Sequence, residues 1–215
     1  MKRTWFAVAV LAVLAIWAAI ALARANGAPA SRTGAPVVGT APAEGLCTGC
    51  HSGNAVNTNG SVTVLGVPPL FRAGTTYRLT VRLASTQQNG NASRTWGFQV
   101  TAVDTANGQG AGTFAVVNAS QTSFVNGSGS FSTRQYVNQN SGGTKGGAAS
   151  PADWQVDWTA PATGSTRVKF FVAGLAGDGS GMGGDWVYTG SVASTDTLTA
   201  ALPATWGQVK AQYLK

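Results

Sequence analysis

The sequence holds little of the chemistry on which most enzymes depend. Its 215 residues include two cysteines, one histidine and two methionines, and only 10% are charged. A Ser/His/Asp triad would have to use the single imidazole, and no phosphate-binding loop is present. Lysine and arginine form no runs, which leaves little support for nucleic-acid binding. A structural zinc site needs four ligands, so it would have to add a carboxylate such as Glu44 to the cysteines and histidine.

The chain begins with a segment typical of export. Lys2 and Arg3 precede an apolar run from Trp5 to Leu22. Ala21-Leu22-Ala23 and Ala23-Arg24-Ala25 both offer small-x-small cleavage sites. We therefore predict that residues 1–25 are a signal peptide and that the protein is periplasmic, secreted or at the cell surface. A run of about 18 apolar residues is also just long enough to span a bilayer, so an uncleaved membrane anchor is the alternative.

Export would change the charge of the working chain. Loss of Lys2, Arg3 and Arg24 reduces 14 basic residues to 11 against 7 acidic ones, and the net charge falls from +7 to +4. A modest positive charge can steer an acidic protein partner toward the chain. In an oxidising compartment, cysteines form disulfides unless they are bound to a cofactor or a metal.

The rest of the chain is typical of an all-β extracellular domain. It is rich in Gly, Thr, Ser, Val and Ala, and strand-like segments alternate with Gly/Asn-rich turns. Residues 76–85 and 95–104 show the clearest alternation of apolar and polar side chains. Further strands are expected at 61–67, 113–118, 133–139, 153–161, 165–175 and 186–195. Regular strands at these spacings predict a β-sandwich. The aromatics expected mainly in its core and rim are Trp154, Trp158, Phe170 and Phe171.

These signals divide the exported chain into three parts. Residues 26–60 are expected to be a coil that carries the Cys/His motif, and residues 61–200 to be the sandwich domain. Residues 201–215 are expected to be a tail with one short helix over 206–215. Within the sandwich, the stretch 68–74 (PPLFRAG) is expected to be a loop.

The scarce sulfur and imidazole groups are gathered in one motif, Cys47-Thr48-Gly49-Cys50-His51. C-x-x-C-H is the attachment signature of c-type haem. Two thiols add across the vinyl groups of the porphyrin, and the histidine that follows binds the iron. We predict one covalent haem c on Cys47 and Cys50, with His51 as the proximal ligand. A disulfide loop or thiol-redox site, and a metal site, are the alternatives.

The sequence leaves the sixth iron ligand open. Met182, in GDGSGMGGDWVY, is the one methionine after residue 25, and as a ligand it would raise the reduction potential. It is otherwise an exposed loop residue, and lysine, an N-terminal amine, water, an open position or a group from another subunit are the other possibilities. Asp178 and Asp185 in the same loop are expected to form turn hydrogen bonds rather than a calcium site.

The later half of the chain carries a longer pattern. The segments WQVDWTAP (154–161), VKFFVAG (168–174) and DGSGMGGDWVY (178–188) resemble the Reeler-type β-sandwich domain, and VLGVPPLFRAGTTYRLTVRL resembles its first strands. With residues 40–53, the chain resembles the bacterial exported proteins called choice-of-anchor V, which join this domain to an N-terminal CxxCH segment. The resemblance implies an Ig-like sandwich and supplies no established activity.

Together these features predict an exported monohaem c-type cytochrome that exchanges electrons with a redox partner protein and is not an enzyme. An extracellular Reeler-like binding or adhesion module, with CTGCH as a disulfide loop, is the first alternative. A haem-based sensor with an open iron site is the second. Membrane contact is expected only if the N-terminal segment stays uncleaved, and nothing indicates a homo-oligomer or filament.

Overall fold

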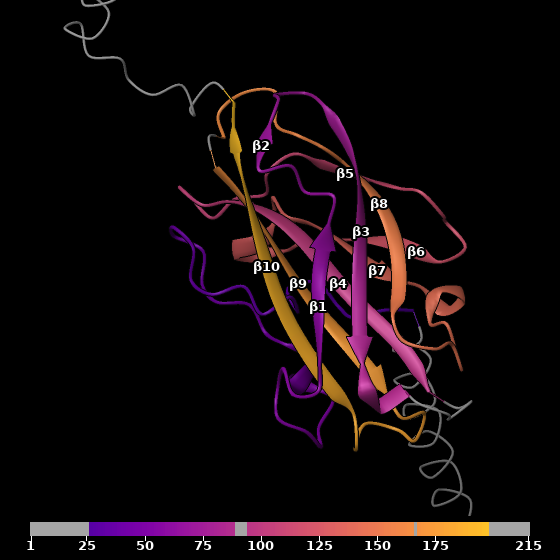
Figure 1. Ribbon diagram of the computed structural model, residues 1–215. Helices are drawn as coiled ribbons and strands as arrows, with labels where there is room; N and C mark the ends of the chain where they lie inside the picture. Colours follow the sequence, from indigo (N-terminus) through magenta and orange to yellow (C-terminus); the bar gives the residue numbers. More distant parts are fainter. Residues whose placement is uncertain (1–25, 89–93, 166, 198–215) are drawn as a thin grey trace, which may run out of the picture.

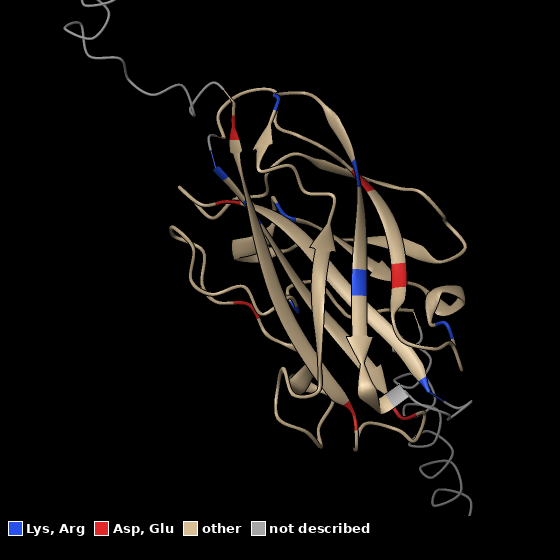
Figure 2. Cartoon of the chain, viewed as in Figure 1, with Lys and Arg blue, Asp and Glu red and all other residues tan. Residues whose placement is uncertain are grey.

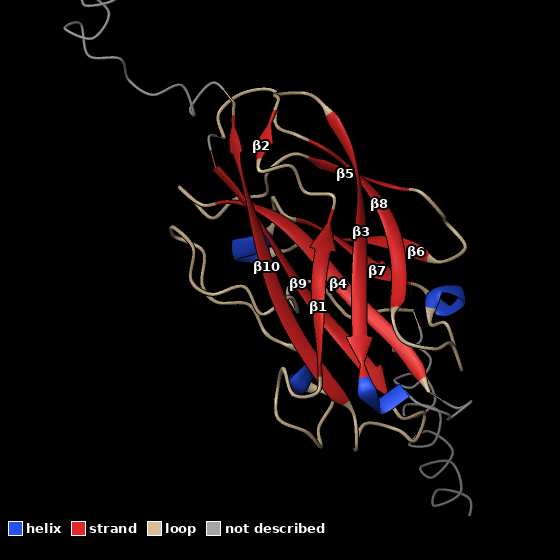
Figure 3. Cartoon of the chain, in the orientation of Figure 1, coloured by secondary structure: helices blue, strands red, loops and turns tan. Residues whose placement is uncertain are grey.

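The protein is a sandwich of two β-sheets (Figures 1 and 3). The computed structural model describes residues 26–88, 94–165 and 167–197. One sheet has four strands in the order β1-β3-β8-β5, and the other has six in the order β2-β10-β9-β4-β7-β6. The predicted all-β sandwich is confirmed. The predicted signal peptide and the short helix over 206–215 lie outside the described residues.

The element bounds follow the sequence pattern closely. The four-stranded sheet contains β1 (Gly60–Leu65), β3 (Thr76–Ser85), β8 (Ala152–Thr159) and β5 (Thr113–Val116). The six-stranded sheet contains β2 (Leu70–Phe71), β10 (Trp186–Asp196), β9 (Arg167–Gly177), β4 (Thr95–Asp104), β7 (Gln135–Gln139) and β6 (Thr122–Asn126). Four single-turn 3-10 helices are η1 (Cys47–Gly49), η2 (Thr86–Gln88), η3 (Gly129–Phe131) and η4 (Ser141–Gly143). In the described part of the chain no helix is long and apolar enough to cross a membrane.

Two strands differ from the sequence prediction. The expected loop at 68–74 contains β2, which pairs in parallel with the end of β10, Leu70 opposite Thr195 and Phe71 opposite Asp196. β6 was not predicted, because its five residues are mostly polar and show no clear alternation. It pairs with β7 at the edge of the six-stranded sheet, where a polar strand is tolerated.

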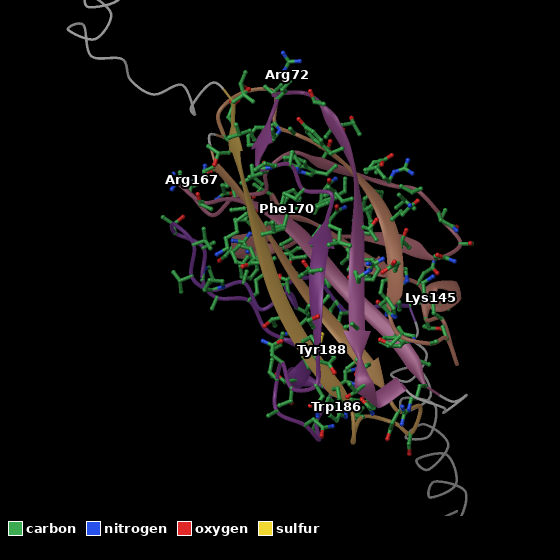
Figure 4. The ribbon with its side chains drawn as sticks, in the orientation of Figure 1. Arg72, Lys145, Arg167, Phe170, Trp186 and Tyr188 are labelled. Carbon is green, nitrogen blue, oxygen red and sulfur yellow. The ribbon has the colours of Figure 1, made fainter. Side chains whose placement is uncertain are left out.

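Large aromatic side chains fill the space between the sheets. Trp154, Trp158 and Phe170 are at most 1% exposed, as the sequence predicts; Figure 4 labels Phe170 among the side chains of the sandwich. The rings of Trp158 and Phe170 meet edge to face, with their centroids 4.8 Å apart. The indole N–H of Trp158 donates to the carbonyl of Ala111 at 2.9 Å, so the buried ring leaves no polar group unpaired. Phe171 is also buried, but in a second cluster on the other side of β9.

The N-terminal part of the chain explains the second cluster. Residues 26–44, which we call the N-terminal arm, cross the outer face of the six-stranded sheet. On that face Gln99, Thr101 and Val103 of β4 are completely buried, although the sequence pattern predicts a half-exposed strand. The arm has the irregular backbone expected of a coil, but it is packed against the sheet rather than a free linker.

Polar side chains of β4 and β7 hold the arm in register. Gln99 Oε1 accepts from the backbone N–H of Arg32 at 2.6 Å, and Gln99 Nε2 donates to the carbonyl of Pro29 at 2.9 Å. Asn138 Nδ2 donates to the carbonyl of Ala28 at 2.6 Å. Buried amides that bond at both ends to one segment favour a single position of that segment.

A buried ion pair fastens the far end of the arm. The Arg134 guanidinium donates to the Glu44 carboxylate and to the carbonyl of Gly108. The Tyr136 hydroxyl donates to the same carboxylate at 2.6 Å, and the Thr33 hydroxyl donates to its other oxygen at 2.5 Å. Both charged side chains are fully buried. Burial, followed by the bond to Glu44, raises the pKa of Tyr136 far above its usual value, so this hydroxyl stays a donor.

The outward face of the four-stranded sheet is different in character. Arg78 and Arg82 of β3 lie opposite Asp157 and Asp153 of β8, and each pair forms an ion pair. Figure 2 shows blue and red segments side by side on these two strands. Because the pairs are exposed, they contribute little to stability.

Candidate functional site

The CTGCH motif folds into a single helical turn. Gly49 N–H donates to the carbonyl of Leu46 at 2.9 Å, and the N–H groups of Cys50 and His51 donate to the carbonyl of Cys47 at 3.1 and 2.9 Å. Side chains three and four residues apart on such a turn lie on the same side. The turn therefore brings the two cysteines and the histidine together, and both cysteines are free thiols.

These three side chains line a cavity of about 300 Å³. It lies between the CTGCH turn, the start of the N-terminal arm and the outer face of the six-stranded sheet. Its walls are mainly apolar and include Pro29, Leu46, Phe98 and Leu175. A volume of this size and an apolar lining are typical of cofactor sites. Arg32 adds a cation, and none of the ion pairs found in the described chain involves it.

The imidazole of His51 is held by a buried carboxylate. His51 Nδ1 lies 2.5 Å from Oδ2 of Asp185, whose side chain is 1% exposed. Because a carboxylate accepts, Nδ1 is the ring nitrogen that donates in this bond, and Nε2 is the nitrogen left available for a bond to a ligand. The other carboxylate oxygen accepts from the N–H of Asp178 at 3.0 Å. Metal-binding histidines commonly have such a carboxylate partner.

Main-chain contacts join the motif to the loop that carries Asp185. Ser52 N–H donates to the carbonyl of Met182 at 2.8 Å, and Asp185 N–H donates to the carbonyl of Ser52 at 3.0 Å. Gly53 (φ +130°) lies so close to Gly184 that a Cβ would come within 2.6 Å of its backbone nitrogen. These backbone contacts hold the two segments against each other, which fixes the orientation of the His51 side chain.

The sequence prediction missed the role of Asp185. It assigned hydrogen bonds within the turn to Asp178 and Asp185, and the carboxylate of Asp178 does accept from the N–H of Ser180 at 2.7 Å. Asp185 also accepts within the loop, from the N–H of Asp178, and its other oxygen bonds across the fold to His51. No local signal marks this contact, since 134 residues separate the two partners.

Met182 reaches the motif through its backbone. Its carbonyl accepts from Ser52, but its side chain is not among those that line the cavity. The structure therefore adds no support for Met182 as the sixth iron ligand, which stays a prediction.

A simple metal site finds no support either. No group of three or more His, Cys, Asp and Glu side chains in the described residues is arranged to hold a metal ion. Glu44, the carboxylate that a zinc site might have added, is bonded to Arg134, Tyr136 and Thr33.

The two cysteines should differ in reactivity. Desolvation by burial raises the pKa of Cys47 to about 11, whereas Cys50 is exposed. Because the thiolate is the nucleophile, we expect iodoacetamide to alkylate Cys50 first in the reduced, haem-free protein. Alkylation of Cys47 should stay slow near neutral pH and accelerate as the pH approaches its pKa. Peptide mass spectrometry over a pH series measures both rates, and equal rates near neutral pH would contradict the raised pKa of Cys47.

Comparison with known proteins identifies a similar fold. A scan of protein-family models and a search of curated proteins find no match. Among solved structures, the chain is similar to the Reelin-N domain of F-spondin, with 19% identity, 70% of this chain and 96% of that chain covered, and a TM-score of 0.42. The reeler domain of human F-spondin is 19% identical, with 68% of this chain and 95% of that chain covered and a TM-score of 0.41. A cohesin module from a Clostridium perfringens family 33 glycoside hydrolase is 14% identical, with 65% of this chain and 98% of that chain covered and a TM-score of 0.41.

Two of these structures are reeler domains, the domain type that the sequence resemblance names, but their TM-scores lie below 0.5. At such identities the similarity concerns the fold and no activity. The relation to exported proteins with an N-terminal CxxCH segment stays a prediction.

Proposed function

We propose that this protein is an exported monohaem c-type cytochrome, with one haem held by Cys47, Cys50 and His51. One observation carries the proposal: two free thiols and an imidazole held through its Nδ1 by Asp185 line the same apolar cavity. Apolar walls suit a porphyrin, and the Arg32 guanidinium suits one of its carboxylate groups. The residues present therefore fit a haem.

Attachment needs both cysteines as reduced thiols. Each adds across one vinyl group of the haem: the S–H bond breaks, a C–S bond forms at one vinyl carbon, and the hydrogen goes to the other. Nothing is oxidised or reduced in this addition. A disulfide between Cys47 and Cys50 would block it, so the proposal requires that the pair stay reduced until haem arrives.

When bound, the haem supplies a one-electron Fe(III)/Fe(II) couple. His51 would bind the iron through Nε2, and Asp185 holds the ring in the required tautomer and places a negative charge behind it. The N-terminal arm and Leu175 form part of the cavity wall, and the degree to which they bury a haem there would also affect the potential. An electron accepted from a reduced partner protein would leave that partner oxidised by one electron, and no proton donor or acceptor is needed.

A haem stain of denatured protein tests the proposal. The full chain is produced with a cytochrome c maturation system, next to Cys50→Ala, the double variant Cys47→Ala/Cys50→Ala, and Ser52→Ala as a control just outside the motif. We expect haem to stay with the wild type and the control, to weaken sharply in the single variant, and to be absent from the double variant. Colourless wild type from a host that matures other c-type cytochromes would rule the proposal out.

The second candidate is an extracellular Reeler-like binding module in which CTGCH forms a disulfide loop. The Reeler-like sandwich agrees with it, and the comparisons speak for the fold rather than for haem. Colourless protein whose mass is two hydrogens below that of the reduced chain would favour this candidate. Covalent haem whose ferrous form binds CO readily would favour a sensor with an open iron position instead.

A further inference from the structure

The residues just after the predicted cleavage site form part of the cavity wall. Gly27, Ala28 and Pro29 line the cavity together with the CTGCH turn. Asn26, the first described residue, is exposed and directly precedes them. Cleavage after Ala25 would therefore start the mature chain one residue from the wall of the proposed haem site.

This start of the chain is held in place rather than loosely attached. Gly27 is buried at φ +95°, and a Cβ on it would come within 2.6 Å of the carbonyl oxygen of Gln139. The next two carbonyls, of Ala28 and Pro29, accept from Asn138 and Gln99 on the sheet. A linker between a leader peptide and a domain needs none of these contacts. The contacts fix the position of the mature N-terminus next to the cavity.

Other groups near the cavity are poor candidates for a second protein ligand to a haem iron. Arg32 keeps its proton in proteins and offers no lone pair. The side-chain oxygen of Gln139 accepts from the N–H of Phe98 at 2.8 Å. The side chain of Met182 does not line the cavity.

The described lysines lie elsewhere. Lys145 Nζ lies 5.6 Å from the centre of the Trp154 ring, and Lys169 Nζ lies 5.3 Å from that of Phe171. Figure 4 labels Lys145 at the right-hand side of the sandwich. Neither lysine lines the cavity.

We propose that the α-amine of Asn26, freed by removal of the signal peptide, is the sixth ligand of the iron. This rests on the haem attachment proposed above. A primary amine binds iron through its nitrogen lone pair. In the precursor the same nitrogen belongs to a peptide bond, where resonance withdraws the lone pair. Cleavage therefore completes the coordination of the haem, and a chain that keeps its leader has an open or water-filled iron position.

The test moves the amine while leaving the haem motif intact. Gly-Ser is inserted between Ala25 and Asn26, and the control carries the same insertion between Thr163 and Gly164, in an exposed turn with open space around the glycine. Met182→Ala is the third variant. All are produced as full chains with haem maturation, and mass spectrometry reads the mature N-terminus. Electron paramagnetic resonance and near-infrared absorption read the ligands of the ferric iron.

We expect wild type, the control and Met182→Ala to begin at Asn26 and to be low-spin without a methionine–iron band. The N-terminally extended variant should keep covalent haem but lose this low-spin form. A second measurement is acetylation of the α-amine in the haem-loaded protein. It should be largely lost in wild type and normal in the extended variant, because a coordinated nitrogen has no free lone pair.

Several results would overturn the inference while leaving the haem proposal standing. These are a mature chain that does not begin at Asn26, high-spin wild-type iron, a low-spin form that survives the extension, and one that is lost in Met182→Ala. Wild type without covalent haem would overturn both.

Discussion

Replacement of Glu44 by glutamine should destabilise the protein by about 3–5 kcal/mol, the usual cost of removing one partner of a buried ion pair. Arg134 is completely buried and would keep its charge without a carboxylate beside it. The hydroxyls of Thr33 and Tyr136 also donate to Glu44, and the amide nitrogen of glutamine cannot accept from them. Total stabilities of single domains are about 5–15 kcal/mol, so this is a large loss. Urea unfolding followed by tryptophan fluorescence measures it.

The matched control is Asp153→Asn, the same change of a carboxylate to an amide in an exposed pair. Asp153 bonds to Arg82 on the open face of the four-stranded sheet, where water can replace the partner. We expect its unfolding midpoint to stay close to that of the wild type. If Glu44→Gln behaved like this control, the arm would not depend on the buried pair.

The Glu44 prediction also bears on the site. Glu44 lies at one end of the N-terminal arm, whose other end forms a wall of the cavity. Arm and sandwich are joined by polar contacts to β4 and β7 and by the small apolar cluster around Phe171. If the arm detaches in Glu44→Gln before the sandwich unfolds, the cavity loses a wall, and the yield of haem-loaded protein should fall more than the stability alone implies.

Strands that alternate apolar and polar residues were predicted well from the sequence. β3 and β4 have the predicted bounds, since local alternation decides which side chains enter the core. The N-terminal arm was predicted as a simple coil, because its sequence has no period that could show what it covers. Its packing is decided by Gln99 and Asn138, which lie far along the chain and look like ordinary polar strand residues.

In the candidate site, too, the local part could be predicted from the sequence and the long-range part could not. The spacing of Cys47, Cys50 and His51 is local, so the motif predicts that the three side chains meet, and they do. The partner of His51 depends on how β10 and its preceding loop approach the motif, which only the folded chain shows. Asp185 follows a glycine-rich stretch whose composition predicts a turn and nothing further.

Asp185→Asn should raise the reduction potential of the haem-loaded protein by about 60–120 mV. The carboxylate behind His51 makes the imidazole more electron-rich and stabilises the ferric iron, and asparagine keeps a similar shape without the charge. Changes to such partners typically alter metal binding about 10- to 100-fold. A tenfold change in a one-electron equilibrium corresponds to about 59 mV. A redox titration followed by haem absorption measures the shift.

The control variant Asp178→Asn distinguishes the effect of the hydrogen bond to His51 on the potential from the effect of losing one negative charge in the loop. Asp178 lies in the same loop, but its carboxylate bonds to Ser180 and does not reach the imidazole. We expect a much smaller shift in potential for this variant. Equal shifts would mean that the loop acts only through its overall charge. An unchanged potential in Asp185→Asn would mean that the buried carboxylate orients His51 without altering its electron density, so that the potential is set by the sixth ligand and by burial.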